Sequence, residues 1–367
     1  MTQTATSISL PTDGLDHLPR TMRALVKDRA AEGLTWDGER PRPTVGPRDV
    51  LIRVKKAGIC GTDRHIWQWD EWAQSRIPLG IVTGHEFAGE VAAVGSVVKR
   101  CAVGDRVSAE GHITAGLDYN SRTGNAHIAR DTQILGVDRD GVYADYVCVP
   151  EDNVWPIHPE ISDSVAATFD PLGNAVHTVM AADVSAKSVL ISGVGIIGLM
   201  AVTVARAAGA ARIFCTDVNP KRLALAKRLG AVEAFDASQG DGWIKDVRKS
   251  CHDGEGVDVL LEMSGSSGGL DAGFRTLRNG GTAALLGLLP KHPEFNFNEH
   301  VIFKGCTVLG INGRRMWETW YQMEEMLLGK RLQLDEIISH EFAAEEYEKA
   351  FGVMNSGEGI KILMDFA

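Results

Sequence analysis

Apolar and polar residues alternate in short runs along roughly the first 150 residues of the chain. Residues 21–54 contain Met-Arg-Ala-Leu-Val-Lys, a stretch rich in Pro and Gly, and then Val-Leu-Ile-Arg-Val-Lys. Residues 87–95, 104–108 and 141–150 continue this pattern. Alternating runs bounded by Pro and Gly are typical of strands joined by turns. The pattern therefore predicts a β-rich domain of antiparallel or barrel-like form.

The pattern changes after residue 162. Residues 162–182 are rich in Ala and begin with a Ser cap, which predicts a helix interrupted at Pro171. Apolar strand patterns then alternate with helical ones, which predicts a parallel, doubly wound sheet. The expected strands are 188–192, 212–217, 257–262 and 282–286, the expected helices between them are 198–208, 221–229 and 270–277, and two further helices are expected at 316–328 and after Ala343.

Length, charge and cysteine content limit the class of protein. A chain of 367 residues exceeds one ordinary hydrophobic core, so we expect two domains. The net charge of -10, with acidic and basic residues mixed, argues against a nucleic-acid or acidic-membrane surface and leaves small polar substrates open. Six cysteines without a C-x-x-C pair, and the lack of a signal-peptide or membrane-spanning pattern, predict a cytoplasmic protein.

A glycine-rich turn follows the first strand of the parallel sheet. The sequence after Ser192 reads Gly193-Val-Gly195-Ile-Ile-Gly198, the G-x-G-x-x-G pattern that brings a pyrophosphate close to backbone amides and a helix N-terminus. Asp217 ends the next strand, where an acid holds ribose hydroxyls and repels a 2′-phosphate. We therefore predict NAD binding, although Arg222 could also lie at the adenosine end. The alternative is an ordinary strand-to-helix turn.

Possible metal ligands cluster between residues 58 and 86. Cys60, His85 and Glu86 offer a thiolate, an imidazole and a carboxylate, which together suit zinc. Asp170 precedes Pro171 near the junction of the two predicted domains and is placed to add a further carboxylate. Taken singly, Cys60 and His85 are more often ordinary core residues and Asp170 a turn or cap residue. Their occurrence beside a dinucleotide turn favours a metal site.

Thr62 and His65 are candidates for a proton relay. In alcohol oxidation the substrate hydroxyl loses a proton while hydride passes to the nicotinamide. A threonine hydroxyl can pass that proton on, and an imidazole can deliver it to solvent near neutral pH. The alternative is a loop threonine and a surface histidine with no such role.

The motifs together resemble those of the zinc-dependent medium-chain dehydrogenases over nearly the whole of residues 22–366. Within that family the chain is most similar to the members that oxidise L-threonine. The segments that carry this narrower resemblance are 57–63 with His65, Trp-Asp-Glu-Trp-Ala-Gln at 69–74, Gly-His-Glu at 84–86, Glu-Gly-His-Ile-Thr at 110–114, 169–178, Thr-Asp-Val-Asn at 216–219, Leu-Glu-Met-Ser-Gly at 261–265, Ile-Phe-Lys-Gly at 302–305 and 313–321.

The resemblance implies a fold, an assembly and a reaction. It implies a GroES-like catalytic domain, a Rossmann domain, a homotetramer and the oxidation of L-threonine to 2-amino-3-ketobutyrate with NAD. The expected ranges are an N-terminal extension at 1–20, the catalytic domain at 21–175, the Rossmann domain at 176–315 and a segment returning to the catalytic domain at 316–367.

Site residues follow from the same resemblance, position by position. The implied zinc ligands are Cys60, His85, Glu86 and Asp170, with Glu86 able to alternate with water or substrate. His112 would lie beside the substrate. The residues implied along the cofactor are Gly193, Gly195, Ile197, Gly198, Asp217, Arg222, Leu286 and Arg314.

One lobe departs from the family pattern. Members usually carry a second, structural zinc on four cysteines, whereas this sequence has Ala115, Asp118, Ser121 and Ala129 at those positions. Two alanines cannot complete a closed tetrahedral site, so we predict one catalytic zinc and no structural zinc per subunit. Two other functions stay open: an NAD-dependent dehydrogenase of a polyol, sugar or other amino alcohol, and a non-catalytic nucleotide-binding relative.

Overall fold

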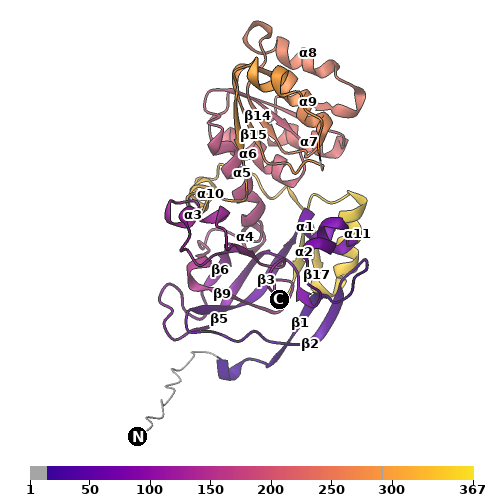
Figure 1. Cartoon of the computed structure of the whole chain (residues 1–367). Coiled ribbons are helices and arrows are strands. Elements are labelled where there is room, and N and C mark those ends of the chain that lie inside the picture. The colour runs from indigo at the N-terminus through magenta and orange to yellow at the C-terminus, as the bar shows by residue number, and fades with distance from the viewer. Residues whose placement is uncertain (1–14, 291) are drawn as a thin grey trace.

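Two bodies of different sheet type make up the computed structural model, which describes residues 15–290 and 292–367 (Figure 1). The body drawn in pink to orange contains a six-stranded parallel sheet, and the mainly indigo body contains the antiparallel strands. This arrangement confirms the predicted fold class of a β-rich catalytic domain with a Rossmann domain. The exact ranges expected for the four segments stay a prediction.

The parallel sheet has the strand order of a doubly wound dinucleotide fold. Its order is β13-β12-β11-β14-β15-β16, so the direction of winding reverses between β11 and β14, where such folds bind their ligands. The strands are β11 (Ser188–Ser192), β12 (Arg212–Asp217), β13 (Glu233–Asp236), β14 (Val257–Glu262), β15 (Leu277–Leu285) and β16 (Thr307–Gly310). Its helices are α6 (Ile196–Ala207), α7 (Pro220–Leu229), α8 (Gly242–Lys249) and α9 (Ser267–Thr276).

The catalytic domain is built on a seven-stranded sheet. Its path is β10-β6-β5-β3-β18-β17, and β9 also pairs with β3. The strands are β3 (Asp49–Ile59), β5 (Glu86–Val94), β6 (Arg106–Ala109), β9 (Tyr146–Pro150), β10 (Val154–Pro156), β17 (Ile338–Ala343) and β18 (Lys361–Asp365). Smaller sheets join β1 (Thr21–Lys27) to β2 (Thr35–Pro41) and β4 (Ile81–Val82), and β7 (His112–Ile113) to β8 (Gln133–Ile134).

The last strands of the chain lie inside the catalytic sheet. β18 pairs antiparallel with β3, and β17 pairs parallel with β18. Helix α11 (Tyr347–Ser356), yellow in Figure 1, lies beside the indigo helix α1 (Gly61–Gln68). The C-terminal elements β18 and α11 therefore lie beside the segment that begins at Cys60.

Helix α5 (Phe169–Ala181) joins the two bodies. It packs on α6 and on α10 (Glu318–Leu328), and its buried residues belong to a core that includes Trp320 and strands of the parallel sheet. The predicted interruption at Pro171 is wrong in position. The short helix α4 (Asp163–Ala166) ends first, and Pro171 lies in the first turn of α5, where backbone N–H groups have no partner within the helix.

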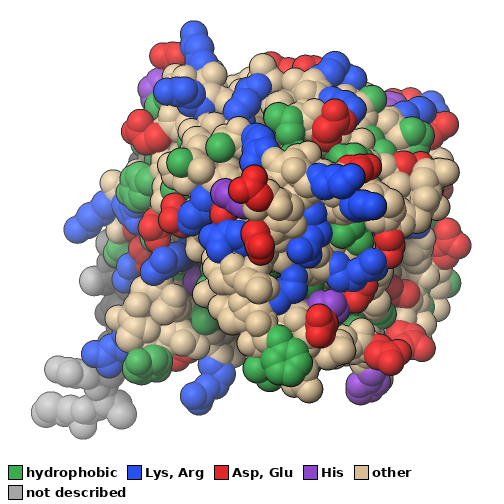
Figure 2. All heavy atoms as spheres, turned by 90° about the horizontal axis from the view of Figure 1, so that it is seen from above, with side chains coloured by type: hydrophobic (Ala, Val, Ile, Leu, Met, Phe, Trp, Pro, Cys, Tyr) green, Lys and Arg blue, Asp and Glu red, His purple; other side chains and the backbone are tan. Residues whose placement is uncertain are grey.

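No helix of the described residues is long and apolar enough to cross a membrane. Figure 2 looks at the molecule from above and shows basic and acidic side chains interspersed over that face. The mixture matches the distribution of charge along the sequence.

Candidate functional site

A thiol, an imidazole and a carboxylate converge at one end of the inner strands β3 and β5 of the catalytic sheet. Cys60 is the N-cap of α1, and Glu86 begins β5 directly after His85. The sulfur of Cys60 lies 3.0 Å from Nε2 of His85, and one ligand atom from each of Cys60, His85 and Glu86 lies within 4.8 Å of the others. Within residues 15–290 and 292–367 no other set of three or more such side chains is grouped this closely.

Local sequence explains why Cys60 lies at this position. The sulfur of Cys60 accepts a hydrogen bond from the backbone N–H of Thr62 at 3.3 Å. The backbone N–H of Cys60 in turn donates to the carboxylate of Asp63 at 3.0 Å, so Cys60 and Asp63 form a capping box. Asp63 is buried and also accepts the hydroxyl of Tyr143 at 2.7 Å. Tyr143 packs against Gly84, where a Cβ would lie 2.4 Å from the ring. The cap and the His85 segment are thus fixed against one another.

The charges of this group favour a bound cation. Burial raises the pKa of the Cys60 thiol, although nearby His85 partly opposes the shift. Burial also raises the pKa of Glu86, against the effect of Lys361. Nδ1 of His85 is buried without a hydrogen-bond partner among the described residues. A metal ion would offset the cost of keeping a thiolate and a carboxylate charged in this buried place, so the residues present fit zinc.

Asp170 faces the same cavity but lies outside the closest group. It stands in the first turn of α5, and its Oδ2 lies 2.5 Å from Nη1 of Arg314. Arg314 is 2% exposed and also pairs with the buried Glu110. Burial lowers the pKa of the Arg314 guanidinium, but Asp170 and Glu110 raise it by more. Asp170 is therefore paired with a buried cation, and its role as a metal ligand stays a prediction.

Arg314 lies in a buried group of polar side chains. It lines neither the cavity at Cys60 nor the one at Asp217, and instead it joins Glu110, Asp170 and the His112 ring. Nδ1 of His112 lies 2.8 Å from Oε1 of Glu110. Although burial opposes ionisation, Arg314 and His112 hold the pKa of Glu110 well below its usual range. A cofactor contact of Arg314 and a substrate contact of His112 stay predictions.

A cavity of about 450 Å³ connects the metal candidate to the glycine turn. Cys60, His85, Glu86 and Asp170 line one part of it, and the turn lines another. A second cavity of about 480 Å³ continues past Asp217. The residues that line both cavities are Gly195, Arg222 and Met263, and Ile197 and Gly198 line the first alone.

The glycine turn has the geometry that the sequence predicts. Gly193 has φ of +85°, and a Cβ there would lie 2.5 Å from the backbone of Ser264. A Cβ at Gly198 would lie 2.1 Å from the carbonyl oxygen of Gly193, whereas the space beside Gly195 is open. Asp217 accepts the N–H of Val194 at 2.9 Å. The turn is therefore closed underneath and open on the side where a pyrophosphate would lie.

Thr62 and His65 both line the first cavity from α1. Thr62 lies two residues after the N-cap Cys60. The His65 side chain is 55% exposed, and its Nδ1 lies 2.5 Å from Oδ2 of Asp70. An exposed imidazole paired with a carboxylate can exchange protons with water. The positions are compatible with a path from the cavity to solvent.

The structure adds cavity residues that the sequence did not indicate. Leu286, the expected cofactor contact after β15, lines neither cavity, whereas Leu288 lines the first and is 94% exposed. Asn174 lies one turn after Asp170 on α5. Met354 and Ile360 come from the C-terminal segment. No local motif marks these side chains, because separate elements bring them together.

Another missed residue is Lys361, whose side chain is fully buried against Glu86. The sequence carried one signal, since a lysine interrupts the apolar run Ile-Lys-Ile-Leu-Met at 360–364. A charge within a buried strand is rare unless it is paired. Only the tertiary structure identifies its partner.

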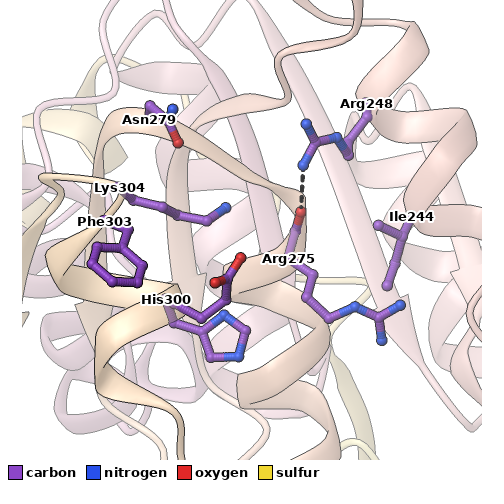
Figure 3. A pocket seen from close by; sticks show the side chains of 8 residues that line it. Ile244, Arg248, Arg275, Asn279, His300, Phe303 and Lys304 are labelled. Atoms are coloured by element: carbon purple, nitrogen blue, oxygen red, sulfur yellow. Dashed lines mark hydrogen bonds between the residues drawn. The ribbon is translucent and has the colours of Figure 1, made fainter.

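A separate cavity in the Rossmann domain has a structural explanation (Figure 3). Arg248 and Lys304 extend into it, and Arg248 donates to the carbonyl oxygen of Arg275 at 2.9 Å. The ammonium of Lys304 donates to the carbonyl oxygens of Phe274 and Leu277. These carbonyls lie at the end of α9, whose C-terminus attracts cations. We therefore assign these cations to capping the helix.

The cysteine-free lobe, residues 114–132, is closed by hydrogen bonds to two aspartates. Asp131 accepts the Thr114 hydroxyl at 2.5 Å and the Ala115 N–H at 2.9 Å. Asp118 caps α3 (Tyr119–Arg122) and accepts the Arg130 N–H at 2.9 Å. Ala115 and Asp118 thus take part in closing the loop at positions where the family has cysteines.

Comparison with known proteins defines the family. The family model for the alcohol dehydrogenase GroES-like domain matches residues 46–159, and that for zinc-binding dehydrogenase matches residues 197–329. L-threonine 3-dehydrogenase of Rhizobium etli is 48% identical over 345 residues, which cover 94% of this chain and 99% of the relative. The chain therefore belongs to the zinc-binding dehydrogenase family. The resemblance inferred from the motifs is confirmed.

Solved structures share the whole architecture. The 2R,3R-butanediol dehydrogenase of Bacillus subtilis is 26% identical, with a TM-score of 0.84 over 95% of this chain and 100% of that one. A zinc-binding dehydrogenase of Sinorhizobium meliloti bound to NADP is also 26% identical, with a TM-score of 0.85 over the same shares. The first of these neighbours is named for its substrate, a butanediol, and the second is described with its bound cofactor, NADP.

Proposed function

We propose that this protein is a zinc-dependent dehydrogenase that oxidises the 3-hydroxyl of L-threonine to 2-amino-3-ketobutyrate with NAD. The observation that carries this proposal is the group of Cys60, His85 and Glu86, whose cavity extends to the glycine turn. The choice of L-threonine as substrate rests on the relatives named L-threonine 3-dehydrogenase. The substrate hydroxyl would then lie at the metal ligands, and the carbon that bears it would face the nicotinamide.

The metal would be held by Cys60, His85, Asp170 and, reversibly, Glu86. Bound there, zinc would supply Lewis-acid polarisation of the substrate hydroxyl. One zinc per subunit is proposed, because the lobe that holds the second metal in the family is closed by Asp118 and Asp131 instead. Metal analysis after dialysis tests this count, and two zinc ions per chain would contradict it.

Side chains of this protein would move the proton and orient the substrate. Thr62 would accept the substrate proton from inside the cavity, and His65 would carry it outward, aided by Asp70. His112 would contact the far end of the substrate. The buried Arg314 and Glu110 hold His112 in place at 2.9 and 2.8 Å.

NAD is proposed over NADP because Asp217 lies beside the adenosine cavity. Arg222 lines the same cavity and would favour a 2′-phosphate, so the pair gives a direct test. D217S should lower kcat/KM for NAD and raise that for NADP, whereas R222M should reduce any turnover with NADP. A wild-type preference for NADP would contradict the proposed cofactor.

A substrate panel tests the substrate. NADH formation should be fastest with L-threonine and slow with polyols, sugars and other amino alcohols. No rate on L-threonine beside a strong rate on a polyol would favour the alternative dehydrogenase. No rate on any alcohol, with NADH still bound, would favour a non-catalytic relative.

A homotetramer in the cytoplasm completes the proposal. β16 is the edge strand of the parallel sheet, and Val308 on it and the preceding Phe303 are 40% and 73% exposed. An open edge with apolar side chains can pair with a second copy about a two-fold axis. Light scattering of the purified protein tests the assembly. The six cysteines are free in the structure, as expected in a reducing compartment.

A further inference from the structure

Three adjacent strands meet directly beneath the metal candidate. β3 lies between β5 and β18, and Gly58 of β3 pairs with Glu86 on one side and Leu363 on the other. Lys361 begins β18 and reaches across Gly58 to the carboxylate of Glu86. The lysine thus comes from the end of the chain, some 275 residues beyond its partner.

Gly58 provides the space for this contact. A Cβ at position 58 would lie 2.5 Å from Oε2 of Glu86 and 2.7 Å from Nζ of Lys361. Any larger residue would therefore separate the two charged groups. The glycine in Ala-Gly-Ile-Cys is explained by this close approach, because its φ is not positive.

The ammonium of Lys361 binds both segments that carry metal-ligand candidates. It donates to Oε2 of Glu86 and, at 3.0 Å, to the carbonyl oxygen of Ile59, the residue before Cys60. The two side chains are 0% and 1% exposed. Because an unpaired buried charge is costly, the pair fixes the Glu86 carboxylate strongly. A metal ion at Cys60 and His85 would have to compete with Lys361 for that carboxylate.

We propose that Lys361 is a positioning residue that holds Glu86 back from the metal, so that a coordination position stays open for the substrate hydroxyl. The inference rests on the proposed metal centre and deepens it. Without the ammonium, the buried carboxylate would find its counter-charge in the metal and would remain bound there. A fourth permanent protein ligand would close the site.

The test uses the full chain loaded with Co²⁺ in place of zinc, because the visible absorption of bound Co²⁺ responds to its ligands. Imidazole serves as an added ligand that needs an open position. Wild type should show a spectral shift on titration with imidazole. K361M should bind Co²⁺ but lose at least tenfold in apparent imidazole affinity, with the absorption already changed before imidazole is added.

Two further variants show whether Lys361 acts through Glu86. K361M/E86Q should regain the imidazole response, since a neutral amide is a poor metal ligand, and it should match E86Q alone. Lys349 is an exposed lysine paired with Glu346, so K349M is the matched control and should behave as wild type. If K361M does not fold, the imidazole responses of K361M/E86Q and E86Q still test the inference. Equal responses would support it, and a difference between them would overturn it.

The results separate this inference from the proposed function. A K361M protein that binds Co²⁺ and responds to imidazole as wild type does would overturn the role of Lys361 alone. A wild-type chain that binds neither Co²⁺ nor zinc would overturn the metal centre, and the role of Lys361 with it. Retention of the imidazole response in K361R would agree with a requirement for the cation.

Discussion

Two regions of the catalytic domain differ in how they hold their segments together. At the metal candidate, the ligand-bearing segments are buried with charged side chains, including Glu86 and Lys361. In the lobe at residues 114–132, backbone N–H groups are bound by Asp118 and Asp131 near the surface. The first region brings together buried side chains of metal-ligating type, whereas the second closes its loop with carboxylates of its own.

The difference shows what a metal does in each place. A surface loop can replace a cross-linking metal with carboxylate-to-backbone hydrogen bonds, because water meets the remaining polar groups. At the metal candidate burial keeps water from doing the same for the Cys60 thiolate, whereas the Glu86 carboxylate is already paired with Lys361. The proposed absence of the structural zinc is therefore compatible with a catalytic zinc at Cys60 and His85.

The largest expected effect comes from removing the thiol. C60S should lose bound zinc, and turnover should fall on the order of a thousandfold, since the metal contributes several kcal/mol. NADH should still bind, because the glycine turn is separate. Zinc analysis, NADH formation and NADH fluorescence measure the three quantities. C101S changes a cysteine outside the cavity and serves as control, and unchanged turnover in C60S would require another centre.

Next in size is the buried cation that links Asp170 to Glu110. R314M should lower the free energy of unfolding by about 3–5 kcal/mol, because two carboxylates lose their partner in a buried place. The neighbouring Arg315 is 49% exposed and pairs with Glu318 at 3.2 Å, so R315M should cost less than about 1 kcal/mol. Urea unfolding measures both. Equal losses would mean that burial does not decide the strength of these pairs.

A smaller effect concerns His127, a buried residue of the lobe. Its ring is 7% exposed and lies 5.4 Å from the His177 ring. Burial, with help from His177 and His112, lowers the pKa of His127 to about 4. The unfolded chain takes up this proton below about pH 6.5 while the native state does not, so stability is lost as pH falls from there toward about 4.

H127N should flatten that acid limb of the stability curve by about 1–3 kcal/mol at the low end. Urea unfolding between pH 7 and pH 4 measures the slope, with the exposed His292 changed to Asn as control. A slope equal to wild type in H127N would show that other groups, such as Glu110, cause the acid sensitivity.

The smallest effect is local. D131A removes the acceptor for Thr114 and Ala115, so amides of residues 114–132 should exchange faster with deuterium. Zinc content and turnover should not change. Asp152, which is 69% exposed and 3.6 Å from Arg48, gives the control D152A. A loss of zinc in D131A would show that the lobe does contribute to metal binding.

The sequence by itself determined the type of fold and most of the ligand types. The glycine turn, Asp217 and the strand-helix alternation are local patterns, which the order of residues along the chain shows without knowledge of the fold. Helix α1 was missed because it is short and its start is a cysteine cap rather than a Ser, Thr or Asp. The helix starting before Pro171 was misjudged because proline is tolerated in a first turn.

Only the tertiary structure decided which charges meet. Lys361 and Glu86, and Arg314 and Glu110, are separated by 275 and 204 residues and carry no shared motif. Their pairing depends on strand order and on the space left by Gly58. Sequence can show that a residue type is present, whereas burial and close approach, which set the energy of a charge, exist only once the chain has folded.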